Sequence, residues 1–295
     1  MIAEAPKVLD ARWRLPEAWG EKEWWFGYLH APDRGVYLSW SCVRTWYMER
    51  FRCWYVDLAG KERVLDRPLF FDRPRGDDRL DLRAGGNPSI RYGAEGQNTL
   101  RLRVDGDGWD VDLEVAPSPA PFTRTEDQFE SWYGVRAHFH NQARGRVKIG
   151  DSEHLIDTTR CYTDHCWGRV PSKTGWHWLA AQDEHVAIDS LVNYGPYGQR
   201  YTQLFIDGRW HPLPDNVVFD VDRRAPDRPW RLRSPDLDLE AHLVRSHRDH
   251  VRVPVLVDLH HDEHVVEVTG RARVDGRWID VGRLVGVTEQ HHGSW

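Results

Sequence analysis

Alternation of apolar and polar residues runs through most of the chain and predicts β-strands. Apolar residues occupy every even position from 36 to 42, and Leu100, Leu102 and Val104 alternate with arginines. A period of two is typical of strands with one buried face. Helical spacing of apolar residues is weak throughout, and the acidic segment Thr125–Trp132 is the best candidate for a short helix. The pattern therefore predicts an all-β fold.

Short turn signals separate the predicted strands. Three Asp-Gly pairs lie between alternating segments, at Asp105-Gly106, Asp207-Gly208 and Asp275-Gly276. Asp-Gly is a preferred sequence of two-residue hairpin turns, because both turn positions need a positive φ. Prolines within residues 117–121 and 212–235 predict irregular connections. The strands are therefore expected to form antiparallel hairpins in a meander.

The length of the chain and the lengths of its apolar segments limit the architectures that are possible. At 295 residues the chain exceeds the size that one hydrophobic core usually supports, which favours two barrels or two halves of one body. Apolar runs such as Val253–Val257 are far shorter than the ~20 residues that cross a bilayer. Residues Met1–Leu15 lack a basic segment followed by a continuous apolar core, so a cytoplasmic location is expected.

Charge and aromatic content narrow the classes of partner. The 40 basic and 46 acidic residues are interspersed, so no nucleic-acid partner is expected. The four cysteines include no C-x-x-C pair and are interpreted as small buried hydrophobes. The 16 tryptophans are the outlier, because each indole buries a large flat surface that suits a core or a cavity wall. A hydrophobic small molecule is the expected partner, and the oligomeric state is left open.

Three segments, in order, carry a resemblance to a known family. Glu23–Leu29 resembles the E-W-W-Y opening strand of the AttH and carotenoid 1,2-hydratase (hydroxyneurosporene synthase) proteins. Trp109–Pro119 is an amphipathic strand that runs into a proline-rich turn, as in those proteins. Cys161–Gly168 resembles their Y-x-D-H-x-W-G motif and is followed by the aromatic segment Trp176–Trp178. The chain departs from the hydratase pattern at Cys166, where Asn is usual, and at Thr163, which replaces a His.

The resemblance implies a fold and a range of chemistry. It implies two lipocalin-like antiparallel β-barrels packed together, an N-terminal one over residues 1–168 and a C-terminal one over residues 169–295. The wider superfamily includes carotenoid hydratases, kievitone-type hydratases and lipocalin-like Diels-Alderases that form decalin rings. All three act on alkenes, so the resemblance directs attention to groups that could protonate or orient a double bond.

Tyr162, Asp164 and His165 are the candidate catalytic residues. If Asp164 faces an apolar, tryptophan-lined cavity, desolvation raises its pKa and keeps it protonated as a general acid. The structural alternative is that Asp164 caps a turn or pairs with a neighbouring arginine. On a strand, Tyr162 and Asp164 point to one face while His165 points to the other, so Asp164 and His165 cannot share a site without a bulge. His165 is either an acid–base group or a structural histidine.

Aromatic residues near the family-like segments are the candidates for substrate binding. The expected ligand wall consists of Trp24, Trp25, Trp40, Trp167, Trp176 and Trp178. Asn193, Tyr194 and Tyr197 lie in a predicted turn that either closes the barrel mouth with hydrogen-bonding groups or is a plain surface turn. Trp24 and Trp25 must face opposite sides of one strand, so at most one of them lines a given cavity.

Metal and cofactor sites are not expected. His138 and His140 alternate as zinc ligands on a strand can, and a second histidine cluster follows Leu259. However, Leu259–His264 is interpreted as a polar turn between two strands. The chain also lacks the G-x-S-x-G, phosphate-loop and dinucleotide-binding glycine motifs. No metal and no cofactor is therefore predicted.

Three functions follow as alternatives. The first is a cofactor-independent hydratase or cyclase that protonates an alkene of an isoprenoid or polyene, as a lyase or an isomerase. The second is a pericyclase that preorganises a linear polyene and gains rate from lost conformational freedom. The third is a carrier that binds a hydrophobic ligand without converting it, because a fold alone does not fix function.

Overall fold

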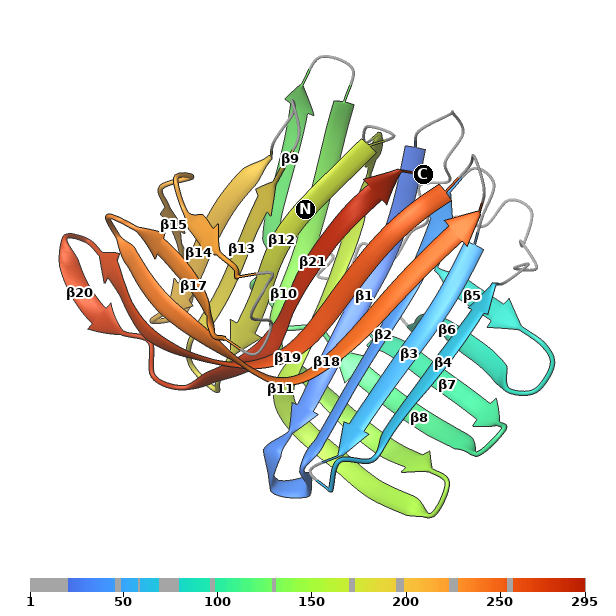
Figure 1. Cartoon of the computed structure of the whole chain (residues 1–295). Coiled ribbons are helices and arrows are strands. Elements are labelled where there is room, and N and C mark those ends of the chain that lie inside the picture. The colour runs from blue at the N-terminus through green and yellow to red at the C-terminus, as the bar shows by residue number, and fades with distance from the viewer. Residues whose placement is uncertain are drawn as a thin grey trace, which may run out of the picture. The chain divides into compact units, whose positions relative to one another are not determined.

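The structure is a computed structural model that divides into two compact units, residues 1–169 and 170–295. It describes residues 21–45, 49–57, 59–68, 80–95, 99–128, 131–169, 173–194, 199–222, 228–253 and 257–294. Each unit holds one curled antiparallel sheet (Figure 1). The all-β prediction is confirmed, since the described residues contain a single helical turn, the 3-10 helix η1 (Pro32–Arg34). No helix in these residues has the length and hydropathy that a membrane-spanning helix needs.

Eleven strands form the sheet of unit 1. They are β1 (Glu21–Ala31), β2 (Val36–Thr45), β3 (Glu49–Asp57), β4 (Glu62–Pro68), β5 (Asp81–Ala84), β6 (Ser89–Glu95), β7 (Thr99–Gly106), β8 (Trp109–Ala116), β9 (Phe122–Gln128), β10 (Ser131–Ile149) and β11 (Ser152–Arg169). Their order across the sheet is β4-β3-β2-β1-β11-β10-β8-β7-β6-β5, and β9 pairs with β10.

Ten strands form the sheet of unit 2. They are β12 (Lys173–Gln182), β13 (Ala187–Asn193), β14 (Arg200–Ile206), β15 (Arg209–Leu213), β16 (Val218–Asp220), β17 (Trp230–Ser234), β18 (Leu237–Val253), β19 (Val257–Val274), β20 (Arg277–Asp280) and β21 (Leu284–Ser294). Their order is β15-β14-β13-β12-β21-β19-β18-β17-β16, and β20 pairs with β19.

The two sheets share one topological feature: the first strand pairs with the last. In unit 1, β1 pairs antiparallel with β11, and in unit 2, β12 pairs antiparallel with β21. All other neighbours on the two paths are antiparallel as well, so hairpins grow outward from each central pair. The tryptophan-rich opening segment of each unit is therefore a central strand, flanked on both sides.

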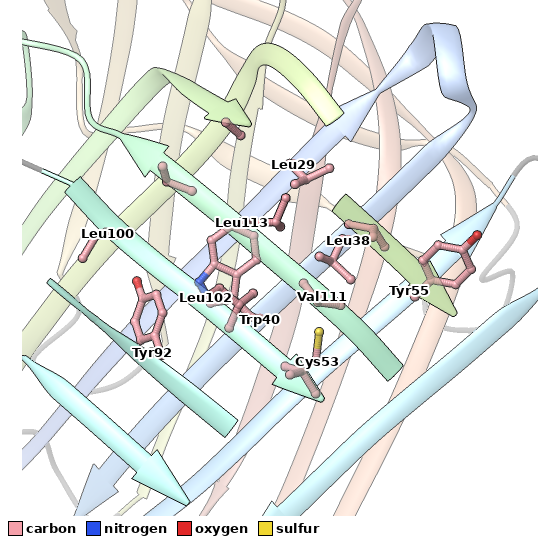
Figure 2. Packing of buried hydrophobic residues seen from close by; sticks show 14 of the residues in the cluster. Leu29, Leu38, Trp40, Cys53, Tyr55, Tyr92, Leu100, Leu102, Val111 and Leu113 are labelled. Carbon is pink, nitrogen blue, oxygen red and sulfur yellow. The ribbon is translucent and has the colours of Figure 1, made fainter. Parts of the chain in front are cut away.

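The hydrophobic core of unit 1 lies on one face of its sheet, here called the inner face. Figure 2 shows Trp40 and Tyr92 beside Leu102 and Leu113 in this core. Gly27 lies opposite Trp40 in the β1–β2 pair, and a Cβ at Gly27 would come within 2.4 Å of the indole. The missing side chain at Gly27 thus makes the space that the Trp40 ring fills.

Side chains of the β4 edge reach the turns of the opposite hairpins in unit 1. The Arg63 guanidinium donates to the Gly108 carbonyl at 3.2 Å, and the Lys61 ammonium, just before β4, donates to the Ile149 carbonyl at 3.0 Å. These bonds link the β4 edge of the sheet to the β7–β8 turn and to the end of β10.

One of the three predicted Asp-Gly turns is wrong in its placement. The β7–β8 turn lies at Asp107-Gly108 and not at Asp105-Gly106, because Gly106 pairs with Trp109 within the ladder. Asp107 and Gly108 have φ of 48° and 69°, so they adopt the conformation expected of an Asp-Gly hairpin. The other two predicted turns, Asp207-Gly208 and Asp275-Gly276, are confirmed by positive φ at all four residues.

Two further segments are extended where a helix or a turn was predicted. The described residues of Thr125–Trp132, 125–128 and 131–132, lie in β9 and β10 and not in a helix, and Thr125 pairs with Gly134 of β10. Its polar residues resemble those of a helix cap, but the backbone N–H and C=O groups form hydrogen bonds with the long strand β10 instead. Leu259–His264 is not a turn: it lies inside β19, between β18 and β21. Backbone hydrogen bonds to two neighbouring strands hold this polar segment extended.

The fit of Trp40 against Gly27 predicts the effect of a single methyl group. Gly27→Ala should lower the free energy of unfolding by about 1–3 kcal/mol, because the added Cβ overlaps the buried indole. Urea unfolding monitored by circular dichroism measures the change. Gly85→Ala is the matched control, since a Cβ there meets no atom within 4 Å. Equal stability of the two variants would contradict the packing described.

Candidate functional site

Asp164 and Tyr162 lie together on the face of the unit 1 sheet opposite its core, here called the outer face. In the β1–β11 register Asp164 is opposite Phe26 and Tyr162 is opposite Tyr28. The Tyr162 hydroxyl donates a hydrogen bond of 2.8 Å to Oδ2 of Asp164. Asp164 is 6% exposed and Tyr162 is fully buried. Strand alternation and a two-residue separation along β11 bring the two groups together.

Aromatic rings surround this pair on the outer face. The outer aromatic cluster consists of Phe26, Tyr28, Tyr37, Trp54, Phe139 and Tyr162, all of them buried. Tyr162 stacks on Tyr28 at 5.3 Å and meets Phe139 edge-on at 4.6 Å. Tyr28 in turn stacks on Tyr37 at 5.9 Å. Through its hydrogen bond to Tyr162, the carboxyl group of Asp164 therefore lies beside a cluster of buried aromatic rings.

Burial sets the protonation of Asp164. Desolvation disfavours its charged form and raises its pKa from 3.8 to about 7. Hydrogen bonds from the Tyr162 hydroxyl, the Phe26 backbone and the Cys166 thiol act in the opposite direction but do not outweigh burial. Within the described residues, Oδ1 accepts no hydrogen bond. A carboxyl group in this setting exchanges its proton near neutral pH.

His165 lies on the inner face and forms a separate polar pair. Its Nε2 is 2.6 Å from Oε1 of Glu23, and both side chains are almost completely buried. Trp25 stacks on the imidazole at 4.0 Å with an interplanar angle of 7°, and Trp167 lies against it at 4.8 Å. The sheet separates this pair from Asp164, so His165 cannot exchange protons directly with Asp164.

A bulge in β10 adds further polar groups to the inner face. The register with β11 shifts between His138 and Asn141, and the Asn141 amide donates to the Thr163 hydroxyl at 3.0 Å and to the His138 carbonyl at 3.1 Å. The Asn141 side-chain carbonyl accepts the Ser118 backbone N–H at 2.9 Å. Burial lowers the pKa of His138 to about 4, so this imidazole is neutral at pH 7. Asn141 therefore stabilises the bulge by hydrogen bonds that the ladder cannot supply.

The six candidate tryptophans are distributed over both units and over both faces of the unit 1 sheet. Trp25 and Trp40 lie in the core of unit 1, and Trp167 shares their face. Trp24 lies on the opposite face of β1 from Trp25, as strand alternation requires. Trp176 and Trp178 belong to unit 2 and lie on the face of β12 opposite Leu179 in its core. Binding of a ligand by these tryptophans stays a prediction.

The predicted turn residues also belong to unit 2. Asn193 ends β13 and pairs with Trp176, and the Tyr194 hydroxyl contacts Nδ1 of His177. Tyr194 is 43% exposed, and Tyr197 lies outside the described residues. His177, on the core side of β12, packs against Trp230 at 5.2 Å. These groups form a polar and aromatic set of their own in unit 2.

Glu23 was not assigned a role from sequence, although it is the buried partner of His165. It stands two positions before Trp25, so strand alternation already places it on the same face.

The histidine cluster that follows Leu259 lies beside acidic side chains. In the described part of unit 2, two groups of His and acidic side chains lie close enough to share an ion: His250, Asp258 and His260, and His261, Glu263 and Glu289. Both depend on the cross-strand register of β18, β19 and β21, which the sequence alone does not reveal.

Comparison with known proteins places this geometry in a family. A family model described as a domain of unknown function, DUF2804, matches residues 16–295. The chain belongs to the DUF2804 family. No curated protein matches the DUF2804 chain in sequence.

Two solved structures share the fold of this DUF2804 protein. The crystal structure of an AttH-type protein from Nitrosomonas europaea has a TM-score of 0.68 at 17% identity, over 97% of this chain and 98% of that one. Kievitone hydratase from Nectria haematococca has a TM-score of 0.65 at 13% identity, over 95% of this chain and 91% of that one. The predicted lipocalin-like fold is thus confirmed.

The raised pKa of Asp164 predicts an unusual pH dependence of stability. Between pH 4 and pH 7 the folded chain binds a proton at Asp164 that the unfolded chain releases, so stability falls as pH rises through this window. Asp164→Asn removes this contribution. From pH 5 to pH 8 the wild type should lose roughly 2–3 kcal/mol of unfolding free energy relative to Asp164→Asn. Urea unfolding at each pH measures the difference, and parallel pH curves would contradict the assignment.

Proposed function

We propose that this DUF2804 protein is a cofactor-independent enzyme that protonates an alkene of a hydrophobic small molecule, with Asp164 as general acid. Water capture would make it a hydratase of isoprenoids or polyenes. Capture by a second alkene forms a ring and a new carbocation, and loss of a proton from that cation to the Asp164 carboxylate would make it a cyclase. The observation that carries the proposal is a buried carboxyl group with a pKa near 7, set among aromatic rings and hydrogen-bonded by a phenol. Such a group is poised to donate a proton at neutral pH.

The two oxygens of Asp164 would have different roles. Oδ2 accepts the Tyr162 hydrogen bond, which leaves Oδ1 to carry the acidic proton. Transfer of that proton to an alkene carbon leaves a carbocation on the neighbouring carbon and a carboxylate at Asp164. In a hydration, a water oxygen then bonds to the cation and a water proton returns to the carboxylate. The cycle closes without an external acid, base or cofactor.

The outer aromatic cluster could stabilise the carbocation intermediate. A carbocation is stabilised by the electron-rich faces of aromatic rings, which do not trap it covalently. Phe26, Tyr28 and Phe139 all lie near Tyr162, the hydrogen-bond partner of Asp164. Burial also excludes bulk water, which would otherwise quench the cation before a ring could close. The fold also supports a hydratase, since kievitone hydratase, whose name describes a hydration, has a similar fold.

A second candidate function rests on the inner face of unit 1. There Trp25, Trp167 and the buried Glu23–His165 pair offer stacking surfaces and one strong hydrogen-bonding pair on the inner side of the sheet. This combination suits a carrier that binds a flat or polyunsaturated ligand without converting it. The carrier does not require Asp164, so substitution there distinguishes it from the enzyme.

The general-acid role predicts a selective loss of turnover. Purified protein is incubated with isoprenoid and polyene alkenes in ¹⁸O-labelled water, and products are identified by mass spectrometry. A gain of one labelled water indicates hydration, an unchanged mass with an altered spectrum indicates ring closure, and retention without conversion indicates a carrier. Asp164→Asn should lower turnover by roughly 100-fold or more.

Asp157→Asn, on the exposed part of the same strand, is the matched control and should retain wild-type turnover. Full activity of Asp164→Asn would remove the general-acid role. If ring closure were unaffected by that change, the enzyme would be a pericyclase, which orders its substrate without an acid.

The Tyr162 hydrogen bond predicts a shift of the pH profile. Because the acid must be protonated, kcat/KM should fall as pH rises through about 7. Tyr162→Phe removes a hydrogen bond that lowers the pKa of Asp164, so the falling limb should move to higher pH. Steady-state rates measured from pH 5 to pH 9 test this. A limb that stays in place, or moves to lower pH, would show that Tyr162 does not tune the acid.

A further inference from the structure

Four chemically related side chains form a two-by-two array on unit 2. Glu263 of β19 is directly opposite Glu289 of β21, and His261 is directly opposite His291 two positions along the same strands. Directly opposed residues of an antiparallel pair share a face, and so do residues two apart. The array therefore presents two carboxylates and two imidazoles together, on the side of β19 opposite Val266 in the core.

The two carboxylates of this array are shielded from water. Glu263 and Glu289 are 2% and 8% exposed. The register places Trp176 and Trp178 of β12 on one side of the array and His247 and Asp249 of β18 on the other.

The spacing of the donor atoms fits a single ion. One ligand atom each from His261, Glu263 and Glu289 lies within 4.8 Å of the others. Nε2 of His261 is 3.7 Å from Oε1 of Glu289. Bonds of ~2.0–2.2 Å to a tetrahedral ion place its ligands roughly 3.4 Å apart, which is close to this separation. The other ring nitrogen of His261, Nδ1, is 3.4 Å from Nδ1 of His291, so His291 neighbours the three ligands and is not one of them.

Trp176 orients two members of the array. Its indole N–H donates to Oε2 of Glu289 at 3.3 Å, while Oε1 of the same carboxylate faces His261. The indole also stacks on His291 at 3.7 Å with an interplanar angle of 8°. Outer groups of this kind fix the direction of metal ligands and strengthen binding. The Trp176 contacts thus hold one carboxylate oxygen and one imidazole toward the centre of the array.

We propose that His261, Glu263 and Glu289 bind one divalent transition-metal ion of the Zn²⁺ class. Mixed imidazole and carboxylate donors favour Zn²⁺, Co²⁺ or Ni²⁺ over Ca²⁺ and Mg²⁺, which prefer oxygen alone. The His261 side chain is 23% exposed, so the ion has a path from solvent. The site lies in unit 2 and is independent of the acid proposed at Asp164.

Calorimetric titration of the chelator-treated full chain with Zn²⁺ tests the site, and Co²⁺ reports ligand geometry through its visible absorption. We expect one equivalent to bind. Glu289→Gln and His261→Gln should each weaken binding by roughly 100-fold, since each removes a direct ligand. His260→Gln is the matched control: it disrupts the exposed group of His250, Asp258 and His260 on the same strands and should leave the affinity unchanged.

Three results would overturn the proposal. These are no binding of Zn²⁺, unchanged affinity in both Glu289→Gln and His261→Gln, or loss of binding in His260→Gln. Tighter binding of Ca²⁺ or Mg²⁺ than of Zn²⁺ would likewise exclude imidazole ligation. Far-UV circular dichroism of each metal-free variant verifies the fold, and His261→Gln, at a partly exposed position, provides a second variant should Glu289→Gln fail to fold.

Discussion

The antiparallel register of β1 against β11 is the constraint on which the arrangement of unit 1 depends. It sets Phe26 opposite Asp164 and Trp25 opposite His165, so neighbours in one short motif point to opposite faces. Both faces are buried at this point of the sheet, which is uncommon for a barrel strand. Asp164 and His165 therefore each lie in a dry environment, and each must act, if at all, with partners on its own face.

Burial of so many ionisable groups works against stability and calls for an explanation. Removing a carboxyl group or an ion pair from water costs several kcal/mol, and apolar residues of similar size would avoid that cost. Unit 1 nevertheless buries Asp164 on one face and the Glu23–His165 pair on the other. Departures from an apolar interior are concentrated at functional sites. The fold shared with an AttH-type protein and a hydratase is compatible with several activities, so these groups carry the functional argument.

Period-two alternation was enough to predict the all-β fold, and three motif segments were enough to predict its lipocalin-like form. Predictions were wrong where strand pairing, and not the local sequence, decides the structure. The sequence Asp105-Gly-Asp-Gly offers two adjacent turns, and only the β7–β8 ladder selects the second. Polar Leu259–His264 resembles a turn until β18 and β21 flank it. For the tryptophans, the face of a strand follows from sequence, but which faces meet does not.

The ionisation of Asp164 can be measured directly. Protein labelled with ¹³C at aspartate carboxyl carbons is titrated by NMR, and the Asp164→Asn spectrum identifies the Asp164 resonance by its absence. A buried acid among aromatic rings should titrate with a midpoint near 7. A midpoint near the ordinary aspartate value of about 4 would show that the carboxyl is charged at neutral pH, and the general-acid function would then be excluded.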